Sequence, residues 1–134
     1  MSREAGPPVS LEAAWRQLSE RGEPSAELTC VAEAALERNA REPVVLDLRG
    51  ISDVTDFFVI ASGDSDTHTR AISENIVDRA REAGFRPVGV EGLNFGRWVL
   101  MDFVGLVVHV FHQPVREFYR LETLWGDAPR LELE

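Results

Sequence analysis

Alternation of apolar and polar side chains is clearest between residues 97 and 112, where two apolar runs flank Val104-Gly105. Successive side chains of a strand point to opposite faces, and β-branched and aromatic residues favour strands, so this stretch predicts a β-hairpin. With Val104-Gly105 as a two-residue loop, Leu100 lies opposite His109. The same register groups five side chains on one face of the sheet: Trp98, Leu100, Asp102, Val107 and His109. A three-residue loop would shift the register and break this grouping.

Helical periodicity dominates most of the remaining chain. Apolar residues recur at i, i+3, i+4 and i+7, which is typical of a helix that buries one side. Four helices are predicted, over residues 10–18, 25–39, 67–83 and 114–126. Ser10 is placed to cap the first, and Gly84 to end the third. In the last helix, the side chains expected on the inner side are Phe118, Leu121 and either Leu124 or Trp125.

Further strands are predicted over residues 44–48, 55–61 and 85–90. This order of elements predicts an α/β (α+β) fold in which helices flank a mixed five-stranded sheet. We expect one domain over residues 25–127, because a chain of 134 residues supports a single compact core. Residues 1–24 are interpreted as an N-terminal extension, partly disordered or a short helix, and residues 128–134 as a flexible tail.

Composition and charge narrow the class of partner. The formal net charge is −9, and all 14 basic residues are arginines that form no cluster of more than two or three. Nucleic-acid binding needs a basic stripe to neutralise phosphates, so extensive direct nucleic-acid contact is not expected, whereas a basic protein partner is favoured. The single Cys30 excludes an internal disulfide, and no apolar run reaches the ~20 residues of a membrane span. These features favour a soluble cytoplasmic protein.

Acidic residues after the second predicted strand are the candidates for chemistry. Asp64 and Asp66 form an Asp-x-Asp pair at the start of a helix, a pattern that suits Mg²⁺. With Asp47 they would make a metal-dependent nucleotidyl or phosphoryl transferase, the alternative function. Helix capping is the favoured interpretation, since such residues are preferred N-caps. His109 and His112 alternate across a strand and cannot share a metal with His68 without a bend.

The hairpin face itself allows two interpretations. It packs under helices as core, or it is an open surface that meets a partner. Asp102 speaks against a fully buried face, because an unpaired carboxylate in a core is costly. An exposed patch of Trp98 and Leu100 beside Asp102 is typical of a protein interface. The residues alone leave both interpretations open.

Several motifs, in one order and at short spacings, resemble those of a known family. They are D-L-R-G-I-S-D-V-T-D-F-F-V-I-A-S-G (47–63), G-V-E-G (89–92), G-R-W-V-L-M-D-F (96–103), V-V-H-V-F-H (107–112) and R-E-F-Y-R-L-E-T-L-W-G-D (116–127). Together they resemble the ribosomal silencing factor family, also called Iojap. The resemblance covers about residues 28–127.

The resemblance implies a translational repressor that is not an enzyme and needs no cofactor or metal. It implies binding to ribosomal protein fourteen of the large ribosomal subunit, which sterically blocks joining of the small subunit. It also implies a nucleotidyltransferase-like topology without the catalysis. The partner-binding residues carried over are Arg97, Trp98, Leu100, Asp102, Phe103, Val107 and His109. A homodimer of the free protein through the same patch is a further expectation. Family members often have Gly-Asp in the hairpin turn, where this chain has Val104-Gly105.

Overall fold

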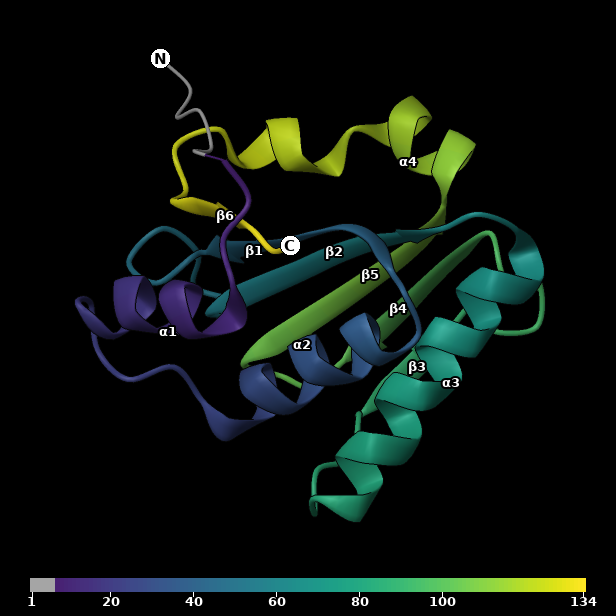
Figure 1. Ribbon diagram of the computed structural model, residues 1–134, viewed down its shortest axis with the longest axis horizontal. Helices are drawn as coiled ribbons and strands as arrows, with labels where there is room; N and C mark the ends of the chain where they lie inside the picture. The colour runs from purple at the N-terminus through teal and green to yellow at the C-terminus, as the bar shows by residue number, and fades with distance from the viewer. Residues whose placement is uncertain (1–6) are drawn as a thin grey trace.

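A mixed six-stranded sheet forms the centre of the computed structural model, which describes residues 7–134 (Figure 1). The strand order is β3-β4-β5-β2-β1-β6, so the sheet has one strand more than the five predicted. The strands are β1 Arg41–Asp47, β2 Phe57–Gly63, β3 Gly89–Glu91, β4 Trp98–Asp102, β5 Leu106–His112 and β6 Arg130–Glu132. β2 and β5 are parallel, and every other neighbouring pair is antiparallel.

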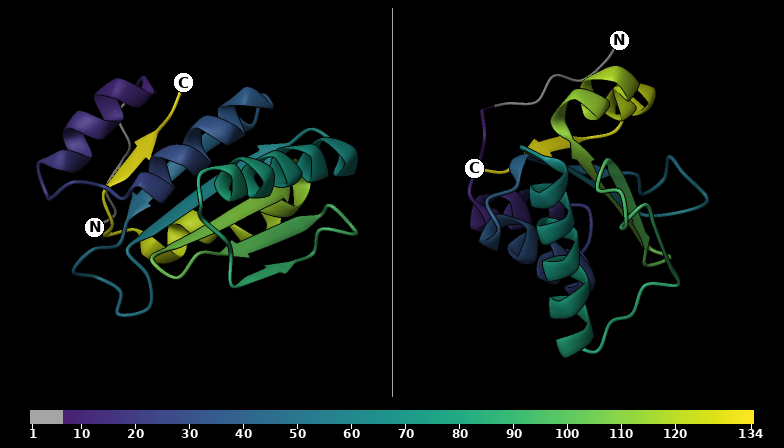
Figure 2. Two further views of the ribbon diagram at one scale, coloured as in Figure 1. Left: turned by 90° about the horizontal axis from the view of Figure 1, so that it is seen from below. Right: turned by 90° about the vertical axis from the view of Figure 1, so that its right-hand side faces the viewer.

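Helices cover the two faces of the sheet unequally (Figure 2). One face carries α1 Leu11–Ser19, α2 Ala26–Glu37 and α3 Asp66–Glu82, and the other carries α4 Gln113–Tyr119 and the 3-10 helix η1 Leu121–Trp125. The side chains of Ser10, Ser25 and Ser65 accept backbone hydrogen bonds at the starts of α1, α2 and α3. These caps confirm the predicted helix starts to within one or two residues. No helix in residues 7–134 is long and apolar enough to cross a membrane.

Alternation along the strands divides the apolar residues between two cores. The larger core lies under α1, α2 and α3 and takes every second residue of the hairpin, including Val99, Met101 and Val108. The smaller core lies under α4 and η1 and is built on Ile60 and Phe111. Because the second face has only these two short helices, part of it stays uncovered.

The C-terminal tail, predicted to be flexible over residues 128–134, contains the sixth strand. β6 pairs with β1 in antiparallel register, with Leu131 opposite Val45. Leu133 is buried in the larger core, and Val9 forms an isolated bridge with it. The prediction was wrong because three residues are too few to show a strand pattern, and a neighbouring edge supplies the hydrogen bonds.

The N-terminal extension is part of the domain from residue 9 onward. Ala14 and Leu18 of α1 are buried in the larger core, and Trp15 donates an indole hydrogen bond to Thr29 of α2. Arg49 donates to the carbonyls of Leu18 and Gly22 at 3.0 and 2.7 Å. Residues 11–19 therefore form the short helix of the interpretation. The expectation of partial disorder concerns residues 1–6 as well, and these lie outside the described residues.

The last predicted helix is broken in two. Arg120 adopts a left-handed conformation, with φ 46°, and separates α4 from η1. The break rotates the two halves relative to each other, so Leu121 and Trp125 pack inward while Phe118 is 81% exposed. Placing Phe118 on the inner side was wrong, because a single helical period was applied across a kink.

Candidate protein interface

The hairpin register is the one expected for a two-residue loop. Asp102 pairs with Val107, Leu100 with His109 and Trp98 with Phe111. The Phe103 N–H donates to the Leu106 carbonyl at 2.8 Å and closes the loop at Val104-Gly105. The five side chains grouped by the sequence pattern therefore share the sheet face that carries α4 and η1.

One end of this face is covered. His109 is only 4% exposed, and its Nδ1 accepts a hydrogen bond from the Trp98 indole at 3.1 Å. Burial lowers the pKa of His109 to about 4, so the ring is neutral at pH 7 with its proton on Nε2. Nε2 finds no hydrogen-bond partner within residues 7–134. His109 is therefore a buried structural residue that fixes the position of the Trp98 indole through this hydrogen bond.

Trp98 joins the covered end to the surface. Its ring stacks on Phe111 with centroids 4.9 Å apart and lies 4.8 Å from the ring of Tyr119 on α4. A groove runs between the start of β4 and α4, lined by Arg97, Trp98, Pro114, Val115, Phe118 and Tyr119. Trp98 is thus partly buried, with one edge open to this groove.

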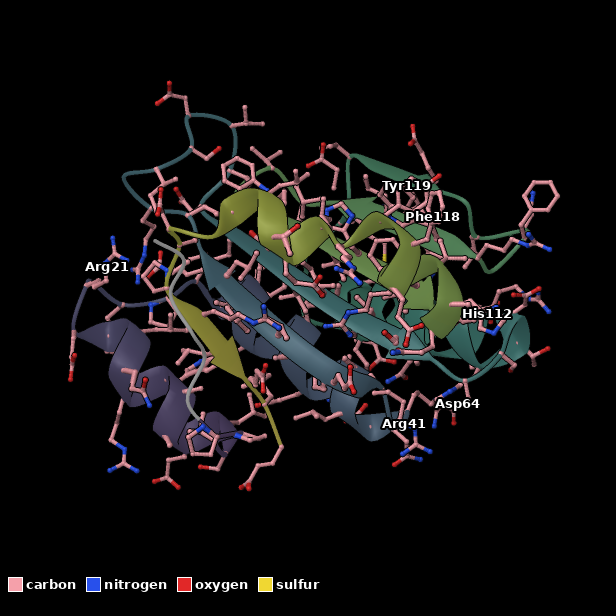
Figure 3. All side chains as sticks on the ribbon, turned by 90° about the horizontal axis from the view of Figure 1, so that it is seen from above. Arg21, Arg41, Asp64, His112, Phe118 and Tyr119 are labelled. Atoms are coloured by element: carbon pink, nitrogen blue, oxygen red, sulfur yellow. The ribbon has the colours of Figure 1, made fainter. Side chains whose placement is uncertain are left out.

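The other end of the face is open. Leu100, Asp102 and Val107 are each partly exposed, on the parts of β4 and β5 nearest the turn. Phe118 and Tyr119, with ring centroids 5.1 Å apart, lie side by side at the outer edge of α4 (Figure 3). Sequence reasoning missed these two aromatic residues because the kink at Arg120, which exposes them, has no signal in the local periodicity. We call Leu100, Asp102, Val107, Phe118 and Tyr119, which lie on this side of the sheet, the open face.

Asp102 and Phe103 have roles that the alternation explains. Asp102 Oδ1 accepts a hydrogen bond from the Val104 N–H at 2.8 Å, so the carboxylate caps the turn without being buried. Phe103 points to the opposite face, is 5% exposed and packs in the larger core. It supports the hairpin from below and offers no surface to a partner. Arg97 is exposed at the start of β4, beside the groove.

The acidic residues considered for catalysis are not brought together. Asp64 accepts hydrogen bonds from Arg41 at 3.1 to 3.2 Å, which hold the pKa of its carboxyl below the usual range. Asp47 pairs with Phe57 at the start of β2, whereas Asp64 follows the end of β2, a separation of roughly 20 Å at strand spacing. Figure 3 shows the arginines that contact them, Arg21 and Arg41, at opposite ends of the molecule.

Each of these acids also has a structural partner. Burial would raise the pKa of Asp47, but hydrogen bonds from Arg49 at 2.8 to 3.1 Å outweigh it and lower the pKa. Asp66 Oδ1 lies 3.1 Å from His112 Nδ1, and Ser65 caps the helix. Within residues 7–134 there is no group of three His, Cys, Asp or Glu that could hold a metal ion. The geometry gives the transferase alternative no support.

Comparison with known proteins identifies the family. The family described as "Ribosomal silencing factor during starvation" matches residues 22–134. The chain belongs to this family. The match extends from the end of α1 to the C-terminal strand and includes the whole open face, whereas α1 itself precedes it. Relatives of this chain are named as ribosomal silencing factors, in agreement with the resemblance seen in the motifs.

Individual relatives match over most of their length. Ribosomal silencing factor RsfS of Bacillus subtilis is 44% identical over 107 residues, which are 80% of this chain and 91% of the relative. A crystal structure from Bacillus halodurans has a TM-score of 0.70 at 39% identity, covering 79% of this chain and 96% of the other. One from Chromobacterium violaceum has a TM-score of 0.73 at 32% identity, covering 75% and 83%. The fold is thus shared with solved structures at substantial identity.

Proposed function

We propose that the protein is a translational repressor of the cytoplasm that binds the large ribosomal subunit. The proposed contact is ribosomal protein fourteen, and the bound protein sterically blocks joining of the small subunit. Membership of the ribosomal silencing factor family supports the ribosomal target. The observation that carries the proposal is the open face, an apolar and aromatic surface on an otherwise covered sheet.

The open face has the anatomy of a protein interface. Specific interfaces are enriched in aromatic and apolar side chains, and the open face combines the aromatic Phe118 and Tyr119 with the aliphatic Leu100 and Val107. A standard interface buries about 1,600 Å² in total, or about 800 Å² on each partner. Exposed apolar patches on a soluble domain mark binding sites more often than accidents of composition.

Charge favours a protein contact over an RNA contact. The chain carries a formal net charge of −9, so phosphate backbones repel it at long range. A basic protein on the subunit surface attracts it instead and speeds the encounter. Asp102, which is partly exposed at the edge of the open face, is placed for such a contact.

The mechanism is occlusion and involves no covalent step. A bound domain excludes the small subunit for as long as it stays bound, so the strength of repression follows the dissociation rate. Two of the residues carried over from the family resemblance, His109 and Phe103, contribute from beneath the surface, because both are buried. We assign the direct contacts to Trp98, Leu100, Asp102 and Val107, with Arg97, Phe118 and Tyr119 at the rim.

Leu100→Arg tests this assignment more sharply than Trp98→Ala. Trp98 holds His109 and packs on Phe111, so its removal also weakens the fold. Leu100 is partly exposed, and an arginine there puts a positive charge where a basic partner docks. We expect at least a tenfold loss in co-sedimentation with purified large subunits, the size typical of a central contact.

Val77→Arg is the matched control, since Val77 is also partly buried but lies on α3, behind the sheet. Both variants are first shown to melt cooperatively. The wild-type protein is also expected to slow the re-association of large and small subunits, measured by light scattering. Equal binding by Leu100→Arg and the wild type would refute the assignment, and wild-type protein that pellets with neither subunit would refute the function.

Self-association is a second use of the same face. A free protein with exposed Phe118, Tyr119 and Leu100 gains by pairing two copies face to face. We therefore propose a homodimer of the free protein, which Leu100→Arg converts to a monomer. Light scattering across a concentration series measures this, and a wild-type protein that stays monomeric at high concentration rules it out.

A further inference from the structure

Val104 occupies a backbone conformation that valine rarely adopts. Its φ is 75°, and of the non-glycine residues with positive φ in residues 7–134 it is the one that is β-branched. The others are Asn39, Glu42 and Arg120. The neighbouring Gly105, which would take such a conformation without cost, does not have positive φ. For a β-branched side chain this conformation is a genuine outlier and stores strain.

The turn holds this conformation firmly. The Gly105 N–H donates to the Phe103 carbonyl at 3.1 Å, a bond that spans Val104 alone. The Asp102 carboxylate accepts the Val104 N–H at 2.8 Å, and the Asp56 N–H donates to the Gly105 carbonyl at 3.1 Å. Strained residues persist where surrounding bonds determine their geometry, and they concentrate at functional sites.

Packing does not explain the valine. Its side chain is 62% exposed and belongs to neither core, so it adds little buried apolar area. Glycine at this position would remove the strain and keep every backbone hydrogen bond of the turn. Neither packing nor backbone preference therefore accounts for a valine at this position.

We propose that the Val104 side chain is a specificity contact, inserted by the hairpin tip into an apolar recess of the partner protein. This inference rests on the proposed function. The tip continues the open face, because Asp102 and Val107 flank the turn on that face. Asp56 Oδ2 lies close to the tip, 3.9 Å from where a Cβ on Gly105 would stand. Asp56 and Asp102 thus place two carboxylates beside the turn, so the recess that fits is apolar with a basic border.

Val104→Gly separates a contact role from a purely structural one, since only a contact role predicts a loss of binding. We expect the variant to melt about 4 °C higher than the wild type, because the strain is released. We expect its dissociation constant for purified large subunits to rise at least fivefold, because the side chain is gone. A purely structural valine would give a change in melting temperature with no loss of binding.

Two further variants test whether a weaker binding of Val104→Gly could come from a disordered turn or from the release of strain alone. Val104→Asn keeps a residue that tolerates positive φ, so the turn stays ordered while the apolar contact is lost, and it should bind as weakly as Val104→Gly. Glu42→Gly releases a strained residue, with φ 47°, at the Ser62 end of β1, far from the tip, and should bind like the wild type. Wild-type affinity in Val104→Gly or Val104→Asn would overturn the specificity role while leaving the proposed function standing. Failure of the wild type to bind would overturn both.

Discussion

His109 makes the stability of this protein depend on pH in a predictable direction. Burial lowers its pKa to about 4 in the folded protein, against about 6.5 for an exposed histidine. Between these values the unfolded chain binds a proton that the folded protein does not. The contribution of His109 to the free energy of unfolding is therefore fully present above pH 6.5 and is lost as the pH drops toward 4.

The size of the effect follows from the two pKa values. At pH 7 the proton-linked loss is only about 0.2 kcal/mol, and at pH 5 it reaches about 2 kcal/mol. Between pH 7 and 5 most carboxylates stay ionised, and the pKa values of Asp47 and Asp64 lie below the usual range, which keeps them out of this window. Replacing His109 by a side chain that does not titrate should therefore remove most of this pH-dependent loss of stability.

His109→Gln isolates this contribution. Glutamine has no titrating group, and its amide oxygen can still accept the Trp98 indole hydrogen bond. Urea unfolding of both proteins at pH 7 and pH 5 gives four free energies. We expect the wild type to lose about 2 kcal/mol more than the variant over this interval. The two proteins differ at position 109 alone, so the difference between their losses reports on that side chain. Equal losses in the two proteins would refute the assignment of His109 as a buried, neutral side chain.

Two further predictions concern the packing of the N-terminal extension and of η1. Leu18→Ala should lower the free energy of unfolding by about 2 to 4 kcal/mol in urea titrations, because Leu18 is 3% exposed in the larger core, whereas a dispensable extension would show no change. Glu122→Ala should lower the free energy of unfolding by about 3 kcal/mol, because it leaves the buried Arg116, whose Nε lies 2.7 Å from Glu122 Oε1, without its charge partner. Glu122→Leu together with Arg116→Met should restore most of that stability. A double variant as unstable as the single one would contradict this account.

Local pattern was informative wherever one face of an element is buried. The alternation over residues 97–112 predicted the hairpin, and the observed register is the one it gave for a two-residue loop. Serine residues ahead of apolar stripes predicted the starts of the helices, because side-chain capping is decided within one turn. The order of the family motifs predicted the family to which the chain belongs.

Non-local contacts decided what the pattern left open. Three-residue β6 exists because the edge of β1 pairs with it. α1 belongs to the domain because Ala14 and Leu18 pack in the larger core and Arg49 donates to the Leu18 carbonyl. The αL conformation of Arg120 turned Phe118 to the surface, against the period of the predicted helix.

For the candidate interface the division is the same. The sequence by itself determined that Trp98, Leu100 and Asp102 share a face, since the period of a strand is a property of the backbone. The observed two-residue loop decided that Val107 and His109 join them. Only the tertiary structure decided that His109 is covered while Leu100 is open, because α4 and η1 are too short to span the sheet. It also gave the positive φ of the turn to Val104 in place of Gly105, because the Val104 N–H donates to the Asp102 carboxylate and the Gly105 N–H donates to the Phe103 carbonyl.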